Sequence, residues 1–240
     1  MIFRVTPIRI LSSMATRRLL GELVAAYEAT NPEPSNAPIG APITVESMGG
    51  VDAAKRVAAG ESYDVAVLAS GALEKLIAQG HIVAGSRVDV VKSPVAFAVC
   101  AGAPRPAIDS EEAVKRAVLA ARTIGYSTGP SGDHLLSLLK RWELSDALKD
   151  RIVQAPPGVP VATLVASGAV ELGFQQLSEF MHASGIEVVG LLPDAIQNVT
   201  TFAGGVAAVS TQPDNARALL SFMASPAVAA LKRQNGMEPA

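Results

Sequence analysis

The sequence predicts an α/β protein built from two units, each a mixed but mostly parallel sheet flanked by helices. Along the 240 residues, short apolar runs alternate with stretches whose apolar positions recur at helical spacing. This strand-then-helix order starts afresh near residue 93. Because strand–helix–strand order implies parallel pairing with covered faces, and about 100 residues is a common size for such a unit, two units fit the chain.

In the first half, each of three expected strands is followed by a helix. The run DVAVLAS is apolar on both faces, as in a strand covered on both sides. Gly80 stands where a glycine commonly ends a helix. The expected strands are residues 9–11, 43–47 and 64–70, and the expected helices are 15–29, 51–60 and 72–80.

The second half repeats this order. Ser110, with Glu111 and Glu112 behind it, suits the cap and the dipole of a helix start. The expected strands are 95–101, 123–127, 169–175, 186–193 and 200–210, and the expected helices are 110–121, 131–144, 162–168 and those within 214–236.

The elements after residue 200 are free to rejoin the first unit. We therefore expect one lobe of residues 1–92 plus 200–240, a second lobe of residues 93–199, and a ligand cleft between them.

Composition excludes several classes of partner. The net charge is −2 without a long basic run, which argues against a nucleic-acid partner. Cys100 is the single cysteine and is expected to be a small buried hydrophobe rather than a nucleophile. The sequence has no CxxC or HExxH motif, so we expect no metal and no cofactor. No apolar stretch approaches the ~20 residues that insertion into a membrane needs.

The first residues, MIFRVTPIRIL, have no sustained apolar core and no small-residue cleavage site. We therefore expect a periplasmic protein if a signal peptide was removed, and a cytoplasmic protein otherwise. We also expect a monomer.

Four loops that precede helices share a composition suited to an anion. Glycines and small hydroxyl residues let backbone N–H groups approach a ligand closely, and a helix N-terminus adds roughly half a positive charge. Together they form an anion cradle without lysine. Any one serine could instead be an ordinary helix cap, and the glycine pair a tight turn. The four loops are Ser12-Ser13, Ser47 to Gly50, Ser127 to Gly132, and Pro156 to Val159.

Several side chains near these loops are candidates for contacts with the ligand. Arg17 and Arg18 lie in the first turn after Ser12-Ser13, where they are either solvated or bound to a carboxylate. His134 follows the third loop and is either structural or an acid–base group. Gln175 and Gln176 end a strand and can both donate and accept hydrogen bonds.

A family resemblance enters through these same residues. The chain resembles the periplasmic molybdate-binding proteins of ABC transporters from about Ile8 to Pro239. The resemblance implies the type 2 periplasmic-binding-protein fold (a venus flytrap), with two lobes that close over an oxyanion, and an ABC permease as partner. It rests on LSSMATRRLLGELVAAYE, SYDVAVLASGALEKLIAQGHIVAGSRVDV, SPVAFAVCAGAPRPAIDSEEAVKRAVLAARTIGYS, VELGFQQLSEF and ARALLSFMASPAVAALKRQNGMEP.

The resemblance also implies site positions, and two of five depart from the molybdate set. The family's second-loop serine is replaced by glycine, and its late tyrosine is replaced by glutamine, which favours an organic carboxylate over molybdate. The five positions fall on Ser13, on Gly49 or Gly50, on Ser131, on Gly158 or Val159, and near Gln176.

Two functions of different class fit this sequence. The first is binding of a small anion for an ABC transporter. The alternative is an isomerase of an unsaturated carboxylic acid, because the resemblance includes aconitate isomerase; His134 would then be the catalytic base. A cytoplasmic ligand sensor is a third reading, without a visible DNA-binding segment. The binder is favoured because no residue is unambiguously a base. Its expected ligand residues are Ser12, Ser13, Arg17, Gly49, Gly50, Ser131, Gly132, Gly158, Val159 and Gln176.

Overall fold

The computed structural model describes residues 7–30 and 43–240, which form two compact units. Of the described residues, 7–30, 43–92 and 201–240 belong to unit 1, and 93–200 belong to unit 2. Two strands, β4 (Val88–Cys100) and β9 (Val199–Val206), each contribute residues to both units. The chain therefore passes from one unit to the other within regular strands rather than in loops.

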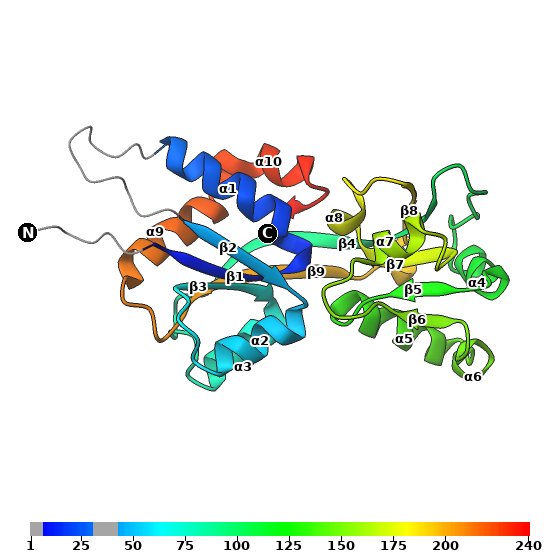
Figure 1. Cartoon of the computed structure of the whole chain (residues 1–240), viewed down its shortest axis with the longest axis horizontal. Coiled ribbons are helices and arrows are strands. Elements are labelled where there is room, and N and C mark those ends of the chain that lie inside the picture. Colours follow the sequence, from blue (N-terminus) through cyan, green and yellow to red (C-terminus); the bar gives the residue numbers. More distant parts are fainter. Residues whose placement is uncertain (1–6, 31–42) are drawn as a thin grey trace, which may run out of the picture. The chain divides into compact units, whose positions relative to one another are not determined.

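Unit 1 is built on a sheet in the order β2-β1-β3-β9 (Figure 1). β1 pairs in parallel with β2 and β3, whereas β9 runs antiparallel to β3 and β10 antiparallel to β4. The strands are β1 (Arg9–Ser13), β2 (Thr44–Met48), β3 (Val65–Ala69) and β10 (Glu238–Pro239). The helices are η1 (Met14–Thr16), α1 (Arg17–Thr30), α2 (Gly50–Ala58), α3 (Ser70–Ala78), α9 (Pro213–Ala224), η3 (Pro226–Val228) and α10 (Ala229–Gln234).

Helices cover both faces of this sheet. Figure 1 shows α1 and α10 on one side and α2 and α3 on the other. Leu19 and Leu23 of α1 pack with Leu219 of α9 in one apolar cluster, whereas α2 and α3 contribute to a second cluster around Leu11 and Leu68. Because successive residues of a strand point to opposite faces, β1, β3 and β9 each supply residues to both clusters.

Unit 2 has the same layered construction. β5 pairs in parallel with β6 and β7, and β4 pairs antiparallel with β7 and β8. The strands are β5 (Ile124–Tyr126), β6 (Ile152–Gln154), β7 (Leu172–Gln176) and β8 (Ile186–Leu191). The helices are α4 (Glu111–Ala120), α5 (Pro130–Arg141), α6 (Ser145–Leu148), α7 (Val161–Ala166), α8 (Leu177–Phe180) and η2 (Asp194–Ile196).

Two apolar clusters also fill unit 2. Phe97 and Phe174 meet edge to face at 5.0 Å, in a cluster with residues of α4 and α5. Phe180 of α8 packs with residues of α7 in the cluster on the other face. The side chain of Gln175, which follows Phe174 in β7, therefore points to the α7 and α8 face.

The predicted α/β fold is confirmed, with local differences. The strand expected at 95–101 begins at Val88, and the strand expected to run to residue 210 ends at Val206. β6 was not predicted, because three half-exposed or exposed residues give no apolar run. Cys100, expected to be buried, is only partly so because it ends β4. The cap at Ser110 is confirmed, since its Oγ accepts a hydrogen bond from the Ala113 N–H at 3.2 Å.

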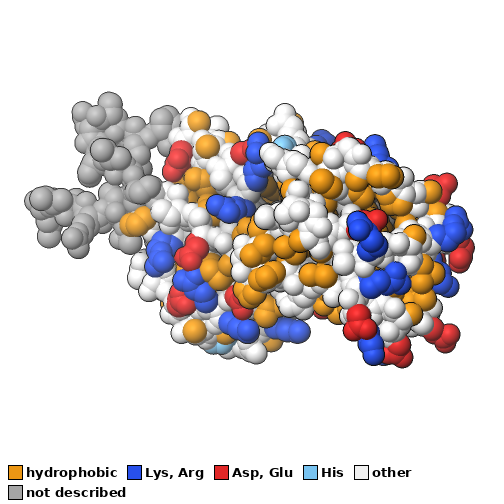
Figure 2. Space-filling view, turned by 45° about the vertical axis from the view of Figure 1, so that its right-hand side comes forward, with side chains coloured by type: hydrophobic (Ala, Val, Ile, Leu, Met, Phe, Trp, Pro, Cys, Tyr) orange, Lys and Arg blue, Asp and Glu red, His pale blue; other side chains and the backbone are white. Residues whose placement is uncertain are grey.

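Charges of both signs are mixed on the surface. On the face that Figure 2 shows, Lys and Arg side chains lie beside Asp and Glu. Within residues 7–30 and 43–240, no helix is long and apolar enough to cross a membrane. In the same part of the chain, no three His, Cys, Asp or Glu residues cluster in a way that could hold a metal ion.

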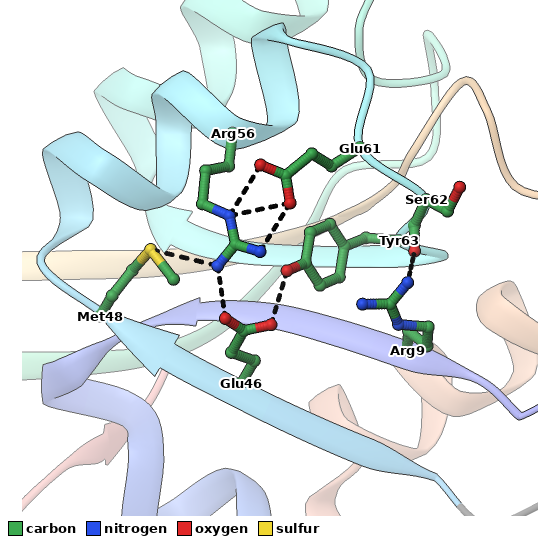
Figure 3. A network of polar contacts seen from close by, with 7 residues as sticks. All are labelled: Arg9, Glu46, Met48, Arg56, Glu61, Ser62 and Tyr63. Carbon is green, nitrogen blue, oxygen red and sulfur yellow. Dashed lines mark hydrogen bonds and ion pairs between the residues drawn. The ribbon is translucent and has the colours of Figure 1, made fainter.

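A polar network fixes α2 on the unit 1 sheet (Figure 3). The Arg56 guanidinium binds Glu46 of β2 and donates two hydrogen bonds to Glu61 Oε2, at 2.8 and 2.6 Å. Tyr63, which is 2% exposed, donates from its hydroxyl to Glu46 Oε2 at 2.6 Å, and the Arg9 guanidinium lies 4.7 Å from the centre of its ring. The hydrogen bond from Tyr63, followed by that from Arg56, lowers the pKa of Glu46.

Replacing Tyr63 with phenylalanine should lower the free energy of unfolding by about 1 kcal/mol at pH 7. A hydrogen bond to a charged group is worth about 1.5–3 kcal/mol, and water around the half-exposed carboxylate reduces that value. Because the pKa of folded Glu46 is lowered, this stabilisation is present above its unfolded pKa and is lost as the pH falls through its folded pKa. Urea unfolding of wild type and variant at pH 7 and pH 3 measures the difference.

The matched control is Tyr126→Phe, because the Tyr126 hydroxyl makes only an exposed 3.3 Å contact to Gln154. That change should stay within about 0.5 kcal/mol. A Tyr63→Phe cost that does not shrink at low pH would show that the ionised Glu46 is not its cause.

Candidate functional site

In unit 1 the first two candidate loops meet at one edge of the sheet. β1 and β2 are parallel, with Ser12 opposite Ser47 and Ser13 opposite Met48. The loops that follow both strands therefore leave from the same edge. A Cβ atom added to Gly50 would lie 3.1 Å from Ser13 Oγ, so glycine lets the start of α2 lie against this hydroxyl.

This edge presents donors for an anion. Ser13 is 6% exposed, and its Oγ forms no hydrogen bond with any residue that the structure describes. Gly50 opens the nine-residue α2, whose first N–H groups have no acceptor within the helix. A hydroxyl and a helix N-terminus side by side suit an oxyanion or a carboxylate.

The neighbouring candidates of unit 1 differ from Ser13. Ser12 is fully buried, and its Oγ lies 2.7 Å from Ser47 Oγ, so this hydroxyl already has a partner in the fold. Arg17 is exposed and forms no ion pair with a described residue. Arg18 binds Glu22 at 3.0 Å on the same helix.

In unit 2 the third loop is held by a close backbone approach. Gly129 has φ +111°, Pro130 is the first residue of α5, and Ser131 is 3% exposed. A Cβ atom on Gly132 would overlap the carbonyl oxygen of Ser127 and lie 2.9 Å from Tyr126 Cδ2. Glycine at position 132 is therefore needed for the first turn of α5 to pack on the strand end.

The fourth loop is a turn on the surface. Gly158 is exposed with φ +77°, a conformation that favours glycine. The N–H of Val159 donates to the Pro156 carbonyl at 3.0 Å, so it already has a partner within the loop.

Gln176 is buried where the chain enters and leaves unit 2. With its amide oriented to satisfy both ends, Nε2 donates to the Ser93 carbonyl and Oε1 accepts from Thr200 Oγ1, each at 2.9 Å. Both polar ends of the amide are thus used within the unit. Gln176 thus links the end of β7 to the neighbouring strand β4 and to Thr200 of β9.

His134 is held on the α5 face of the unit 2 sheet. Its Nε2 lies 2.7 Å from the Ile196 carbonyl oxygen, and its ring centre lies 6.3 Å from that of Phe174. A carbonyl only accepts, so Nε2 is the protonated nitrogen and Nδ1 is the one left to take a proton.

A polar group on the opposite face joins two sequence candidates, Ser127 and Gln175, to Glu179, which the sequence did not point to. Gln175, which is 2% exposed, donates from Nε2 to Ser127 Oγ at 3.0 Å and to Glu179 Oε2 at 2.7 Å. Burial raises the pKa of Glu179 to about 8, and the hydrogen bond from Gln175 opposes this shift. The only sequence signal for Glu179 was its place four residues after a strand-end glutamine, because the burial of its carboxyl group depends on tertiary packing.

The predicted cleft between the units stays a prediction.

Comparison with known proteins places the chain in a family. A model of the bacterial extracellular solute-binding protein family matches residues 8–238, so the chain belongs to this family. It is 38% identical to an aconitate isomerase from a Pseudomonas species, over 98% of this chain and 88% of that protein.

Solved structures share the fold. The periplasmic molybdate-binding protein of Azotobacter vinelandii is 21% identical with a TM-score of 0.76, and covers 96% of this chain and 98% of its own. The sulfate-binding protein SubI of Mycobacterium tuberculosis is 15% identical with a TM-score of 0.75, and covers 98% of this chain and 87% of its own. At these identities the likeness shows the fold alone. The resemblance to molybdate-binding proteins and the type 2 binding-protein fold are confirmed.

Substituting Gly132 with alanine should lower the free energy of unfolding by about 2 kcal/mol or more, because the new methyl group meets backbone rather than a side chain that can move. Gly21→Ala is the control: Gly21 lies within α1 with nothing within 4 Å of an added Cβ, and alanine there should stabilise by about 0.5–1 kcal/mol. Thermal unfolding measures the stability of both variants against the wild type. If Gly132→Ala melts with or above the wild type, the close approach at Ser127 does not require glycine.

Proposed function

We propose that this member of the bacterial extracellular solute-binding protein family is an isomerase of an unsaturated tricarboxylic acid of the aconitate type. One observation carries the proposal: the 38% identity to an aconitate isomerase extends over 98% of the chain. The anion-binding proteins that share the fold reach 21% identity or less in the comparisons above. The relative therefore outweighs the binders as a guide to chemistry.

The strand-end loops support a polycarboxylate ligand. Ser13 Oγ and the N-terminus of α2 offer donors in unit 1, and Ser131 lies in the first turn of α5 in unit 2. A helix N-terminus favours negative charge and needs no counter-cation. Arg17, exposed and without an ion pair among described residues, would add a charged contact to a carboxylate.

Delivery of an anion to an ABC permease is the second candidate. The family match over residues 8–238 favours it, because it assigns the chain to extracellular solute-binding proteins. This role would place the protein in the periplasm as a monomeric carrier. It requires the same donors for the anion but no proton transfer.

Wild-type protein incubated with cis- or trans-aconitate in deuterated water should interconvert the two acids and place deuterium on the carbons that exchange protons. The reason is that a proton must leave one carbon and return to another, and a side-chain acid exchanges with solvent in between. Proton NMR measures both events. Tight binding of either acid with neither product nor exchange over hours would instead establish the carrier.

Removing the Ser13 hydroxyl should weaken binding of trans-aconitate by roughly 10- to 100-fold, since a hydrogen bond to a charged group is worth about 1.5–3 kcal/mol. Isothermal titration calorimetry on Ser13→Ala measures this loss. Ser12→Ala is the matched control: it removes the neighbouring hydroxyl, which is bonded to Ser47, and should lower stability with little effect on affinity. Equal affinity losses in the two variants would contradict the assigned role of Ser13.

A further inference from the structure

Unit 2 contains a polar group, called the Glu179 group below, that consists of Ser127, Gln175 and Glu179. β5 and β7 are parallel with Tyr126 opposite Phe174, so Ser127 and Gln175 follow at the same carboxyl edge of the sheet. Ligands of open α/β sheets bind at this edge. Through the amide of Gln175, Glu179 is connected to the first residue of the loop 127–132.

The group is incompletely satisfied. Gln175 Oε1 is buried without a hydrogen-bond partner among the described residues, although the whole residue is 2% exposed. Unpaired buried polar atoms are rare, because each costs about 1–3 kcal/mol. Glu179 Oε2 accepts from Gln175, whereas Oε1 forms no bond to a described residue and is not one of the fully buried atoms. One carboxyl oxygen is thus held by Gln175, while the other forms no hydrogen bond with a described residue.

We propose that Glu179 is the catalytic residue that carries the proton in the isomerisation, and that Gln175 is the residue that positions it beside the loop 127–132. This inference rests on the proposed function. It replaces His134 as the proton-transfer group, because the Nε2 of His134 is bound to the Ile196 carbonyl and its ring lies against Phe174, on the other face of the sheet from Gln175.

The surroundings of Glu179 suit this role. α8 packs against β7 and β8, and Phe180 joins it to α7. β7 and α7 contain no ionisable residue, and Glu187 of β8 accepts a hydrogen bond from the Gly102 N–H at 3.1 Å. Water is displaced from the carboxyl although the residue is only partly buried, which raises its pKa to about 8. At neutral pH it is mostly uncharged and tolerates an anion nearby, and near pH 8 a large fraction becomes a base.

The proton shift balances without another reactant. The Glu179 carboxylate takes a proton from the methylene carbon of the acid, and this C–H bond breaks. The electron pair spreads over the three-carbon allylic system and its carboxylate as the double bond moves. The Glu179 carboxylic acid then returns the proton to the carbon at the other end of that system. Nothing is oxidised or reduced, and Glu179 ends as it began.

The test is Glu179→Gln, with Glu171→Gln as the matched control. Glutamine keeps the shape and can still accept from Gln175, so the fold and binding of trans-aconitate should persist. We expect kcat to fall by roughly 100-fold or more with KM little changed. Glu171 lies just before the other end of β7, bound to Arg122, and its variant should turn over like wild type. Wild-type kcat/KM, which reports the pKa of the free enzyme, should rise about tenfold per pH unit and level off near pH 8.

Each outcome of these experiments either supports or overturns the role of Glu179. Wild-type turnover that survives in Glu179→Gln would overturn this inference and leave the proposed function standing. A wild type that neither isomerises nor exchanges protons overturns both. If Glu179→Gln does not fold, Glu179→Asp decides: reduced kcat at unchanged KM supports the role, and unchanged kcat overturns it.

Discussion

The contact of α5 with the end of β5 is the constraint on which the geometry of unit 2 depends. Any side chain at position 132 would overlap the Ser127 carbonyl, so only glycine lets the first turn of α5 reach the strand end. That contact fixes Ser127, and Ser127 in turn accepts the hydrogen bond from Gln175 that continues to Glu179. In unit 1 the start of α2 approaches β1 less closely, with Gly50 facing Ser13 Oγ. This contact likewise brings hydrogen-bond donors together at the edge of the sheet. In the proposed function, this backbone proximity, rather than a cluster of cations, supplies the donors for the anion.

The same protein can bind an anion and retain a base because the two needs are met by different groups. Of the two causes that act on the pKa of Glu179, the Gln175 amide favours the ionised form, whereas burial favours the neutral form and has the larger effect. Glu179 therefore keeps the pKa of about 8 that burial gives it, since no arginine or lysine among the described residues causes the opposite shift. In the proposed function, this desolvated carboxyl at the strand edge supplies proton transfer on a fold that sulfate- and molybdate-binding proteins share.

Much of the fold follows from sequence periodicity, whereas the candidate site follows only in part. Alternating apolar runs predicted the main strands, and the serine and glycine loops predicted the edge at Ser13 and Gly50, because these are local signals. β6 was not predicted because its three half-exposed or exposed residues carry no pattern of apolar positions. His134 was selected because it follows an anion loop, yet strand alternation and the Ile196 carbonyl place it on the other face. Glu179 could not be found because its desolvation arises from packing between α8, β7 and β8. The family match confirms the expected solute-binding family, and the relative at 38% identity supports the isomerase that the sequence left as an alternative.

The central claim is that a carboxyl group at this strand edge moves a proton on a bound unsaturated acid. A crystal structure of Glu179→Gln with trans-aconitate tests it most directly, because the variant should bind without turning over. We predict that the methylene carbon of the acid lies about 3–3.5 Å from the side-chain oxygen or nitrogen of residue 179, the separation of reacting atoms in a productive complex. An acid bound with that carbon far from residue 179, and beside Nδ1 of His134 or solvent instead, would contradict the claim.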